Sequence, residues 1–259
     1  MNFDFSLKSK ILAYHKFSAK NEFNKHLKLI SNRTDVLITV DDGDMSFYDN
    51  AFPLLKKYNI PSILFIIPSL IDTDKPFWWD EYFYYSDNQG NNNELNWLKS
   101  IPNKDRLSFL ETLKQNSDKP VYKKKQLTID QLLEMQDNGV IIANHSYTHP
   151  MVDQCTEDEL REELSKTKDF FDRNKLNGFE TFAYPNGNFN ELAESILKEF
   201  GIKYAFLFDH KVNGKNPDPL RISRLSVNDS TPMTKFKFIL SGWHSKLLPL
   251  IKAGHKLLN

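Results

Sequence analysis

The stretch Val36–Pro68, VLITVDDGDMSFYDNAFPLLKKYNIPSILFIIP, predicts the unit from which the rest of the fold is built. VLITV at 36–40 and PSILFIIP at 61–68 are apolar runs rich in β-branched residues, which is typical of buried strands. Between them, FYDNAFPLLKKY at 47–58 places its apolar residues at helix spacing. A strand, a helix and a second strand in this order indicate parallel pairing through a crossover.

Units of the same kind continue along the chain. Caps support two of the helices, because Thr128 and Thr156 are good N-cap residues and Glu159 completes a capping box with Thr156. The alternation favours a (β/α) barrel, complete or incomplete, whose working residues lie at the C-terminal ends of the strands. The further strands are expected at 11–15, 140–144, 179–185, 203–208 and 221–227, the last of them as a strand or an edge segment.

Residues 71–125 interrupt this alternation. The run begins with the aromatic stretch FWWDEYFYY, continues with a polar loop and ends with a predicted helix at 104–115. We interpret 71–125 as an insertion in a single domain that covers 1–259. Its aromatic stretch, with Trp78 and Trp79, is either a platform that stacks on sugar rings or a hydrophobic hinge that anchors the insertion.

The composition excludes several classes of protein. Lys and Arg together number 34 and so do Asp and Glu, so the chain has no overall basic field for nucleic acid. The single cysteine, Cys155, excludes an internal disulfide and a cysteine-based zinc site. The start MNFDFSLKSK lacks the pattern of a signal peptide, and no apolar stretch is long enough for a membrane span. We therefore expect a cytoplasmic protein.

Polar, reactive side chains follow four of the predicted strands. If residues 145–149 form a helical turn, the two histidines of HSYTH lie on one face and can bind one ion. Two histidines and a carboxylate make a three-ligand metal site with open positions, as a hydrolytic metal requires. The side chains concerned are those of His15, Asp41, Asp42, His145, His149 and Asn186.

Asp41 and Asp42 are neighbouring carboxylates at the end of a buried strand, so they repel each other and lose solvation. A cation would relieve this repulsion if one aspartate bound it while the other acted as a general base. The residues alone leave open which aspartate does which. Taken singly, Asp-Asp-Gly is often only a turn, and His-x-x-x-His is often only a polar helix face.

Three motifs resemble those of the polysaccharide deacetylase family, which is carbohydrate esterase family four with the NodB-homology domain. They are TVDDG at 39–43, HSYTH at 145–149 and FAYPNG at 182–187. The resemblance covers roughly residues 10–227. It implies an α/β fold, a distorted (β/α)7 barrel, here with a helical and aromatic insertion and a C-terminal helical tail.

The resemblance also implies roles for individual residues. Asp41 is the expected catalytic base, and the backbone N–H of Tyr184 is expected to stabilise the tetrahedral oxyanion. One divalent metal ion is implied, most often Zn²⁺, with Co²⁺ or Ni²⁺ as alternatives. Its expected ligands are Asp42, His145 and His149.

The sequence departs from the family pattern in two places. The arginine that orients the base in many relatives is missing from FAYPNG, and Arg224 or Arg221 would have to replace it. No late histidine lies in a good context for the general acid, so we assign that role to His15 in ILAYHKF, as in family branches that begin with this strand. The alternative for His15 is a buried core histidine. The expected substrate contacts are Trp78, Trp79, Asn186 and Arg224.

Residues 232–259 form a basic tail without any acidic residue. Phe236, Ile239, Leu240, Trp243 and Leu247 recur at helix spacing, which is compatible with an interfacial membrane helix or with a helix packed on the barrel. The membrane interpretation would place the protein peripherally at the inner membrane face and suit a lipid-linked sugar.

The function expected from the sequence is metal-dependent removal of an acyl group, with N-acetyl as the expected group, from a sugar or glycan precursor in surface-polysaccharide synthesis. One alternative keeps the metal site but acts on a small amide or formamide. Another is a catalytically inactive barrel that binds glycan. No nucleic-acid partner is expected.

Overall fold

A computed structural model of the chain describes residues 9–18, 20–86, 92–245 and 247. In this part of the chain, parallel strands form one seven-stranded sheet in the order β6-β5-β4-β3-β2-β1-β7. The order is sequential from β6 to β1, as expected for strand–helix units that each add a neighbouring strand. The strands are β1 Lys10–Tyr14, β2 Val36–Val40, β3 Ser62–Ile66, β4 Val140–Asn144, β5 Gly178–Ala183, β6 Tyr204–Phe206 and β7 Leu225–Ser226.

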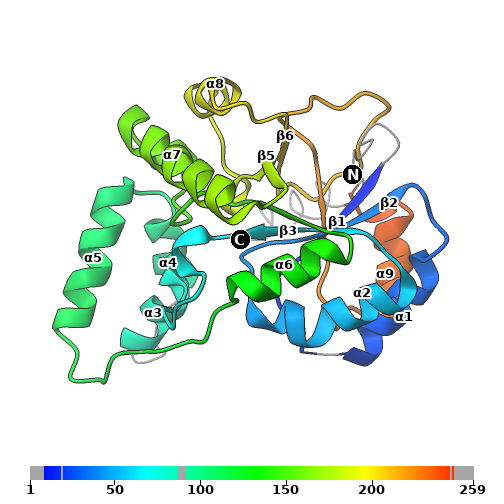
Figure 1. The fold of residues 1–259 in the computed structure, drawn as a ribbon, viewed down its shortest axis with the longest axis horizontal. Helices are drawn as coiled ribbons and strands as arrows, with labels where there is room; N and C mark the ends of the chain where they lie inside the picture. Colours follow the sequence, from blue (N-terminus) through cyan, green and yellow to red (C-terminus); the bar gives the residue numbers. More distant parts are fainter. Residues whose placement is uncertain (1–8, 19, 87–91, 246, 248–259) are drawn as a thin grey trace.

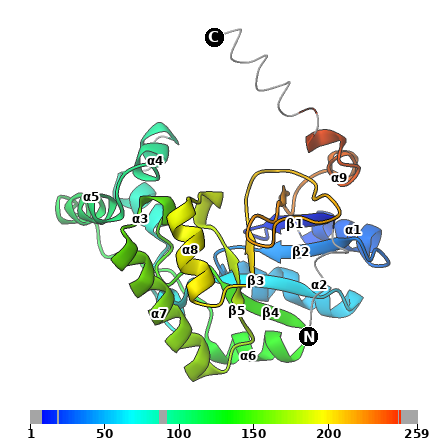
Figure 2. The same cartoon turned by 90° about the horizontal axis from the view of Figure 1, so that it is seen from above.

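Helices surround this sheet (Figure 1). Seen from above, α7 and α8 lie beside β4 and β5, while α1 and α9 lie on the β1 side (Figure 2). The predicted caps are present: the Thr128 and Thr156 side chains accept from the N–H groups of Gln131 and Glu159 in complete capping boxes. The helices are α1 Lys20–Ile30, α2 Phe52–Tyr58, α6 Ile129–Asp137, α7 Glu157–Asn174, α8 Glu191–Glu199 and α9 Met233–Leu240, and a π-helical turn at Phe47–Ala51 precedes α2.

One short segment, residues 219–226, joins the two edges of the sheet. Ile222 forms a parallel bridge with Phe206 at the end of β6. Three residues later, Leu225 in β7 pairs with Leu12 in β1. The sheet therefore curls into a distorted (β/α)7 barrel, which confirms the predicted fold class. The predicted last strand at 221–227 is reduced to this bridge and the two residues of β7.

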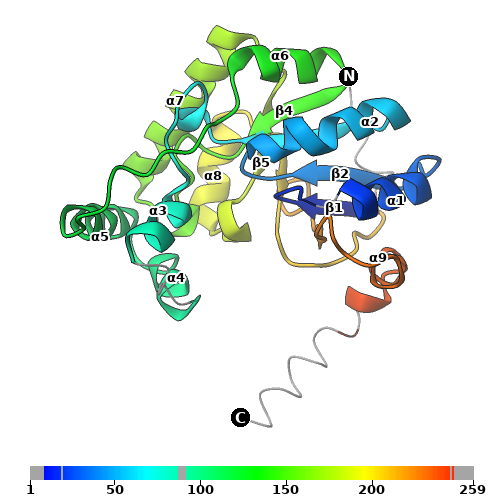
Figure 3. The same cartoon turned by 90° about the horizontal axis from the view of Figure 1, so that it is seen from below.

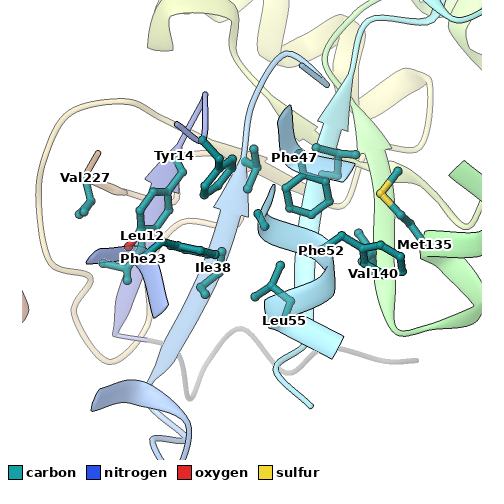
Figure 4. Packing of buried hydrophobic residues seen from close by; sticks show 14 of the residues in the cluster. Leu12, Tyr14, Phe23, Ile38, Phe47, Phe52, Leu55, Met135, Val140 and Val227 are labelled. Atoms are coloured by element: carbon teal, nitrogen blue, oxygen red, sulfur yellow. The ribbon is translucent and has the colours of Figure 1, made fainter. Parts of the chain in front are cut away.

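The strand residues alternate between the barrel interior and the outer helical layer. On β2, Ile38 and Val40 pack outward with Phe23, Phe47 and other aromatic side chains (Figure 4). Leu37 belongs to a separate cluster to which six of the strands and the closing segment contribute. The same alternation continues to Asp41, which therefore faces the interior. The interior cluster consists of Ile11, Leu37, Ile63, Phe65, Ala143, Ala183, Phe206 and Ile222.

The 71–125 segment contributes helices α3 Trp78–Tyr85, α4 Asn92–Leu98 and α5 Asn103–Gln115. These helices group at one side of the barrel, away from α1, α2 and α9 (Figures 1 and 3). Lys124 attaches the segment to the barrel, because its Nζ lies 2.9 Å from Asp44 Oδ2 and 2.7 Å from Asp80 Oδ2. The segment therefore stands next to the C-terminal end of β2.

The predicted tail begins with α9, which packs on the barrel. Phe236, Ile239 and Leu240 are buried in the same cluster as the outer faces of β1 and β2. Trp243 and Leu247 are exposed, and residues 246 and 248–259 lie outside the described part of the chain. Among the helices that are described, none has the length and apolar character needed to cross a membrane.

Candidate active site

The turn after β2 presents the two aspartates. Asp42 and Gly43 both adopt left-handed backbone conformations, with φ of 73° and 72°. A Cβ atom at position 43 would also lie 3.3 Å from Cγ2 of Ile66, so glycine fits both the space and the conformation. The left-handed Asp42 is uncommon for a non-glycine residue, and such conformations concentrate at functional sites.

Asp42, His145 and His149 converge on one point. Oδ1 of Asp42 lies 3.5 Å from Nε2 of His145 and 3.6 Å from Nε2 of His149. Burial alone would raise the pKa of Asp42, but the hydrogen bond with His145 and the nearby His15 and His149 hold it well below its usual range. Burial, together with His145, lowers the pKa of His149 to about 3. The carboxylate is therefore ionised and His149 neutral at pH 7, as metal ligands must be.

The two histidines do not meet by way of a helical turn, which corrects the sequence prediction. Residues 145–149 form a loop in which Ser146 and His149 have φ of 63° and 61°. Nδ1 of His145 lies 2.8 Å from the carbonyl oxygen of Ala183. A ring N–H donated to that carbonyl leaves Nε2 as the free ligand atom, an arrangement common for histidines that bind metal.

These three side chains fit a divalent metal ion. Their ligand atoms all lie within 4.8 Å of one another. Ligands of a tetrahedral zinc ion are about 3.3 Å apart, given zinc–ligand bonds of about 2.0–2.1 Å. The two separations between Asp42 and the histidines, 3.5 and 3.6 Å, lie close to that value. Two imidazoles and one carboxylate suit zinc and also other transition metals.

Arg224 holds Asp41 through a buried, two-pronged ion pair. Nη1 and Nη2 of Arg224 lie 2.5 and 2.7 Å from the two carboxylate oxygens. Arg224 Nε donates to the carbonyl of Leu207, and Nη1 also donates to Oγ1 of Thr39. Burial alone would raise the pKa of Asp41, but Arg224 and, to a lesser extent, His145 hold it below its usual range. Asp41 is therefore ionised and fixed in orientation.

The structure shows which of the two arginines reaches Asp41: it is Arg224. Arg221 points elsewhere and makes its own two-pronged pair with Glu194. Arg224 was also expected to contact substrate, and this expectation is corrected. Its side chain is fully buried in the barrel interior beneath Asp41, where it does not line the cavity described below.

His15 follows β1 at the same rim of the barrel. Its side chain is 40% exposed, and its Nε2 lies 3.8 Å from Oδ2 of Asp41. The ring packs edge-on against Phe208. These observations contradict the alternative of a buried core histidine. That description fits His26, which is fully buried between the hydroxyl of Tyr14 and the carbonyl of Thr231.

A cavity of about 280 Å³ opens over these groups. Its size is near the lower limit for small-molecule sites, about 300 Å³. Trp79 packs edge-on against the ring of His149, and Nε1 of Trp78 lies 3.5 Å from Nδ1 of the same histidine. The cavity is lined by His15, Asp41, Asp42, Trp78, Trp79, Leu95, Lys99, His145, His149, Asn186 and Phe208.

Tyr184 does not take the place expected of it. Its backbone N–H donates to the carbonyl of Phe206 at 3.0 Å, and its side chain is buried in the outer layer with Phe182 and Phe189. Asn186, two residues later, lines the cavity with a φ of 59°. No described residue accepts a hydrogen bond from its backbone N–H.

Three residues of the cavity wall carried no signal in the sequence. Leu95 and Lys99 come from the polar stretch around α4, and Phe208 follows β6. None of them belongs to a motif or has a distinctive spacing. The places of Leu95 and Lys99 follow only from the packing of the 71–125 segment against the barrel rim, and that of Phe208 from the position of β6 in the barrel.

The model of the family described as polysaccharide deacetylase matches residues 29–205, and the chain belongs to this family. Among curated proteins, the poly-β-1,6-N-acetyl-D-glucosamine N-deacetylase of Staphylococcus aureus strain MSSA476 is 25% identical over 212 residues. The match covers 82% of this chain and 59% of that protein. The enzyme of the same name from Staphylococcus epidermidis is 24% identical over 238 residues, covering 88% of this chain and 62% of the relative. The chain thus spans about three-fifths of the length of these relatives.

Solved structures share the fold. The Streptococcus pyogenes deacetylase PplD, solved in complex with acetate, aligns with a TM-score of 0.64 at 18% identity. That alignment covers 91% of this chain and 97% of the other. IcaB from Ammonifex degensii aligns with a TM-score of 0.60 at 17% identity, covering 90% and 95%. These similarities support the (β/α)7 architecture independently of the sequence motifs.

Proposed function

We propose that the chain is a metal-dependent deacetylase that removes the N-acetyl group from a sugar of a surface polysaccharide. The observation that carries the proposal is the juxtaposition of an ionised, arginine-held Asp41 with the Asp42–His145–His149 triad in one cavity. A module that only binds glycan has no use for a base beside three metal ligands. The names of the staphylococcal relatives suggest a poly-N-acetylglucosamine as the first substrate to test.

Each of the polar groups in the cavity has a separate role in the proposed reaction. Asp41 accepts the proton of the water that attacks the amide carbonyl. A divalent cation held by Asp42, His145 and His149 would polarise that carbonyl and bring the pKa of a water towards 7, within reach of a weak base such as Asp41. The backbone N–H of Asn186, rather than that of Tyr184, is our candidate donor to the developing oxyanion.

His15 completes the reaction by protonating the leaving amine. It faces the same cavity as Asp41 and is exposed enough to exchange protons with solvent. The C–N bond breaks as the proton arrives, and the products are acetate and a free amino sugar. A general acid of this kind typically contributes about 10²–10⁴-fold in rate.

Acetate release tests this function. The metal-loaded protein is incubated with a β-1,6-linked N-acetylglucosamine oligomer, and free acetate and new amino groups are both measured. Equal yields of the two products, absent in Asp41→Asn, would support the proposal. Activity on small formamides but on no glycan would favour the small-amide alternative. A metal-loaded protein that binds the oligomer without turnover would favour the inactive barrel.

The ligand set also bears on which metal ion the site binds. We infer zinc because two imidazoles and a carboxylate are a common zinc ligand set, with cobalt and nickel as alternatives. Activity measured after chelation and reloading with each ion tests this choice. The highest activity with another ion would overturn it.

We also propose that the C-terminal tail contacts a membrane surface and so favours a lipid-linked substrate in the cytoplasm. Phe238, Trp243 and Leu247 are exposed, and the tail after Asp229 has no acidic residue. Truncation is unsuitable as a test because α9 belongs to the core. Sedimentation with anionic vesicles should instead be compared between the wild type and a Trp243→Ser, Leu247→Ser variant. Equal binding by the two proteins would contradict the proposal, and cell fractionation tests the location.

A further inference from the structure

Lys99 is a cation of the cavity wall that the reaction scheme does not use. It lies just after α4 in the 71–125 segment and is half-buried. Its Nζ donates to Oδ1 of Asn186 at 3.1 Å across the mouth of the cavity. Asn186 is a neutral partner, so this hydrogen bond does not neutralise the ammonium charge.

Two other cations near the site are paired with acids, while a third, Arg106, lies over the ring of Trp78 and donates to Asn103. Arg224 has Asp41 at 2.5 Å, and Lys124 has Asp44 at 2.9 Å as well as Asp80. No carboxylate of the described residues lies within ion-pair distance of Lys99. Burial lowers the pKa of Lys99, an effect that the more distant Asp42 only partly offsets. A partly desolvated ammonium is costly unless an opposite charge joins it.

Neither aspartate of the cavity is free to pair with Lys99 once a metal ion is bound. Asp41 forms an ion pair with Arg224, and Asp42 faces two histidines at the candidate site of a divalent cation. Lys99 therefore adds positive charge to a cavity that is already positive once the metal is bound. Such a cavity attracts an anion.

We propose that Lys99 is a specificity-determining residue that binds an anionic group of the substrate, a carboxylate or a phosphate carried by the glycan beside the acylated sugar. This inference rests on the deacetylase function proposed above and narrows its substrate class. Trp79 and Leu95 provide the apolar part of the same wall, so one wall offers a stacking surface and a charge. The 71–125 segment would thus distinguish an acidic glycan from a neutral one.

The test compares three matched oligosaccharides that differ in one substituent beside the N-acetylated sugar: a hydroxyl, a carboxylate or a phosphate. The kcat/KM of the metal-loaded wild type should be higher for one or both anionic forms, and the preference should decrease with added salt. In Lys99→Met the ratio of anionic to neutral kcat/KM should fall about tenfold or more, and Lys99→Arg should retain most of it. Comparison of the carboxylate form with the phosphate form identifies which anion Lys99 recognises.

Lys104→Met is the matched control, because Lys104 is an exposed lysine of the same segment that does not line the cavity. It removes the same charge and should leave the ratio unchanged. Equal loss on neutral and anionic forms in Lys99→Met would overturn the proposal. So would a wild type that shows no preference for either anion.

A binding measurement separates this proposal from the deacetylase function. The deacetylated forms of the same oligosaccharides cannot turn over, and calorimetry gives their affinity for the metal-loaded protein. Tighter binding of the anionic forms that disappears in Lys99→Met supports the charge recognition even if no acetate is released from any substrate. Acetate release without any such difference in affinity or in kcat/KM would leave the deacetylase function standing and overturn the role of Lys99.

Discussion

The barrel rim and the 71–125 segment both line one cavity, and they contribute different kinds of residue. The rim provides ionisable groups held in fixed relations, such as Asp41 against Arg224 and Asp42 against His145. The segment provides two tryptophans, a leucine and a lysine that has no acidic partner among the described residues. The rim residues come from strand ends, whereas those of the segment come from short helices that contact the barrel at its edge.

This difference indicates a division of labour. Groups that move protons or hold a metal must be fixed within fractions of an ångström, which strand ends in a hydrogen-bonded sheet achieve. Groups that recognise a substrate need surface and charge complementarity, and these can vary without disturbing the sheet. We therefore expect substitutions at the rim to affect turnover or folding, and substitutions in the segment to affect substrate affinity and choice.

The largest expected effect is on turnover, at His15. His15→Ala should lower kcat by about 10²–10⁴-fold, because the leaving amine loses its proton donor, while metal content and thermal stability stay close to those of the wild type. His26→Gln is the matched control, since it changes a buried histidine away from the cavity and should reduce stability with little effect on kcat. A His15→Ala variant that loses stability but keeps its kcat would contradict the role of His15 as proton donor.

Next in size is the loss of the buried ion pair. Arg224→Met removes the guanidinium that pairs with the buried Asp41, which should lower the free energy of unfolding by about 3–5 kcal/mol in denaturant titrations. Arg161→Met is the control: the side chains of Arg161 and its partners Glu157 and Glu199 are 37%, 53% and 52% exposed, and a pair of that kind should contribute about 1 kcal/mol or less. Equal losses of unfolding free energy in the two variants would show that water screens the Asp41–Arg224 pair despite its burial.

A smaller effect is expected from the aromatic wall. Trp79→Ala should weaken substrate affinity about tenfold, with kcat changed less, because the ring that borders His149 and the cavity is lost. Tyr84→Ala removes a ring of the same helix that stacks on Tyr122 outside the cavity, and should leave KM unchanged. If Trp79→Ala lowered stability without raising KM, the segment's aromatic residues would be a hinge rather than a platform.

The smallest expected effect is a pH dependence of stability at His26. Burial lowers its pKa in the folded protein, so between that pKa and about 6.5 the unfolded chain binds more protons. Stability should therefore fall as the pH decreases below about 6.5. Thermal unfolding at several pH values should show a weaker dependence in His26→Gln than in the wild type, and identical slopes would contradict the assignment.

Local patterns were sufficient to predict most of the architecture. The strands of Val36–Pro68 and the capping boxes depend on residues that are close in sequence, and the candidate metal ligands lie in two short motifs that the family resemblance singled out. The choice between Arg224 and Arg221 was not predictable, because Arg224 lies 183 residues from Asp41 and reaches it only through the closing segment 219–226. Its position depends on how the two edges of the sheet meet.

Two further details could not be predicted because they depend on backbone conformation. HSYTH has the spacing of a helical turn, yet left-handed Ser146 and His149 make it a loop that still brings both imidazoles together. FAYPNG does not show that the N–H of Tyr184 is used in the sheet while Asn186 turns to the cavity. Lys99 lies in a polar stretch without any pattern, so only the packing of α4 beside the rim could reveal it.

The proposed function requires that Asp42, His145 and His149 form a metal site beside Asp41. The most direct test is the metal content of the purified, untagged protein, measured by mass spectrometry for the wild type, Asp42→Ala and His149→Ala, with the exposed Asp49→Ala as control. We expect about one divalent ion per chain in the wild type and the control, and none in the two folded site variants. A wild type that binds no metal even after incubation with zinc, cobalt or nickel would contradict the proposed function.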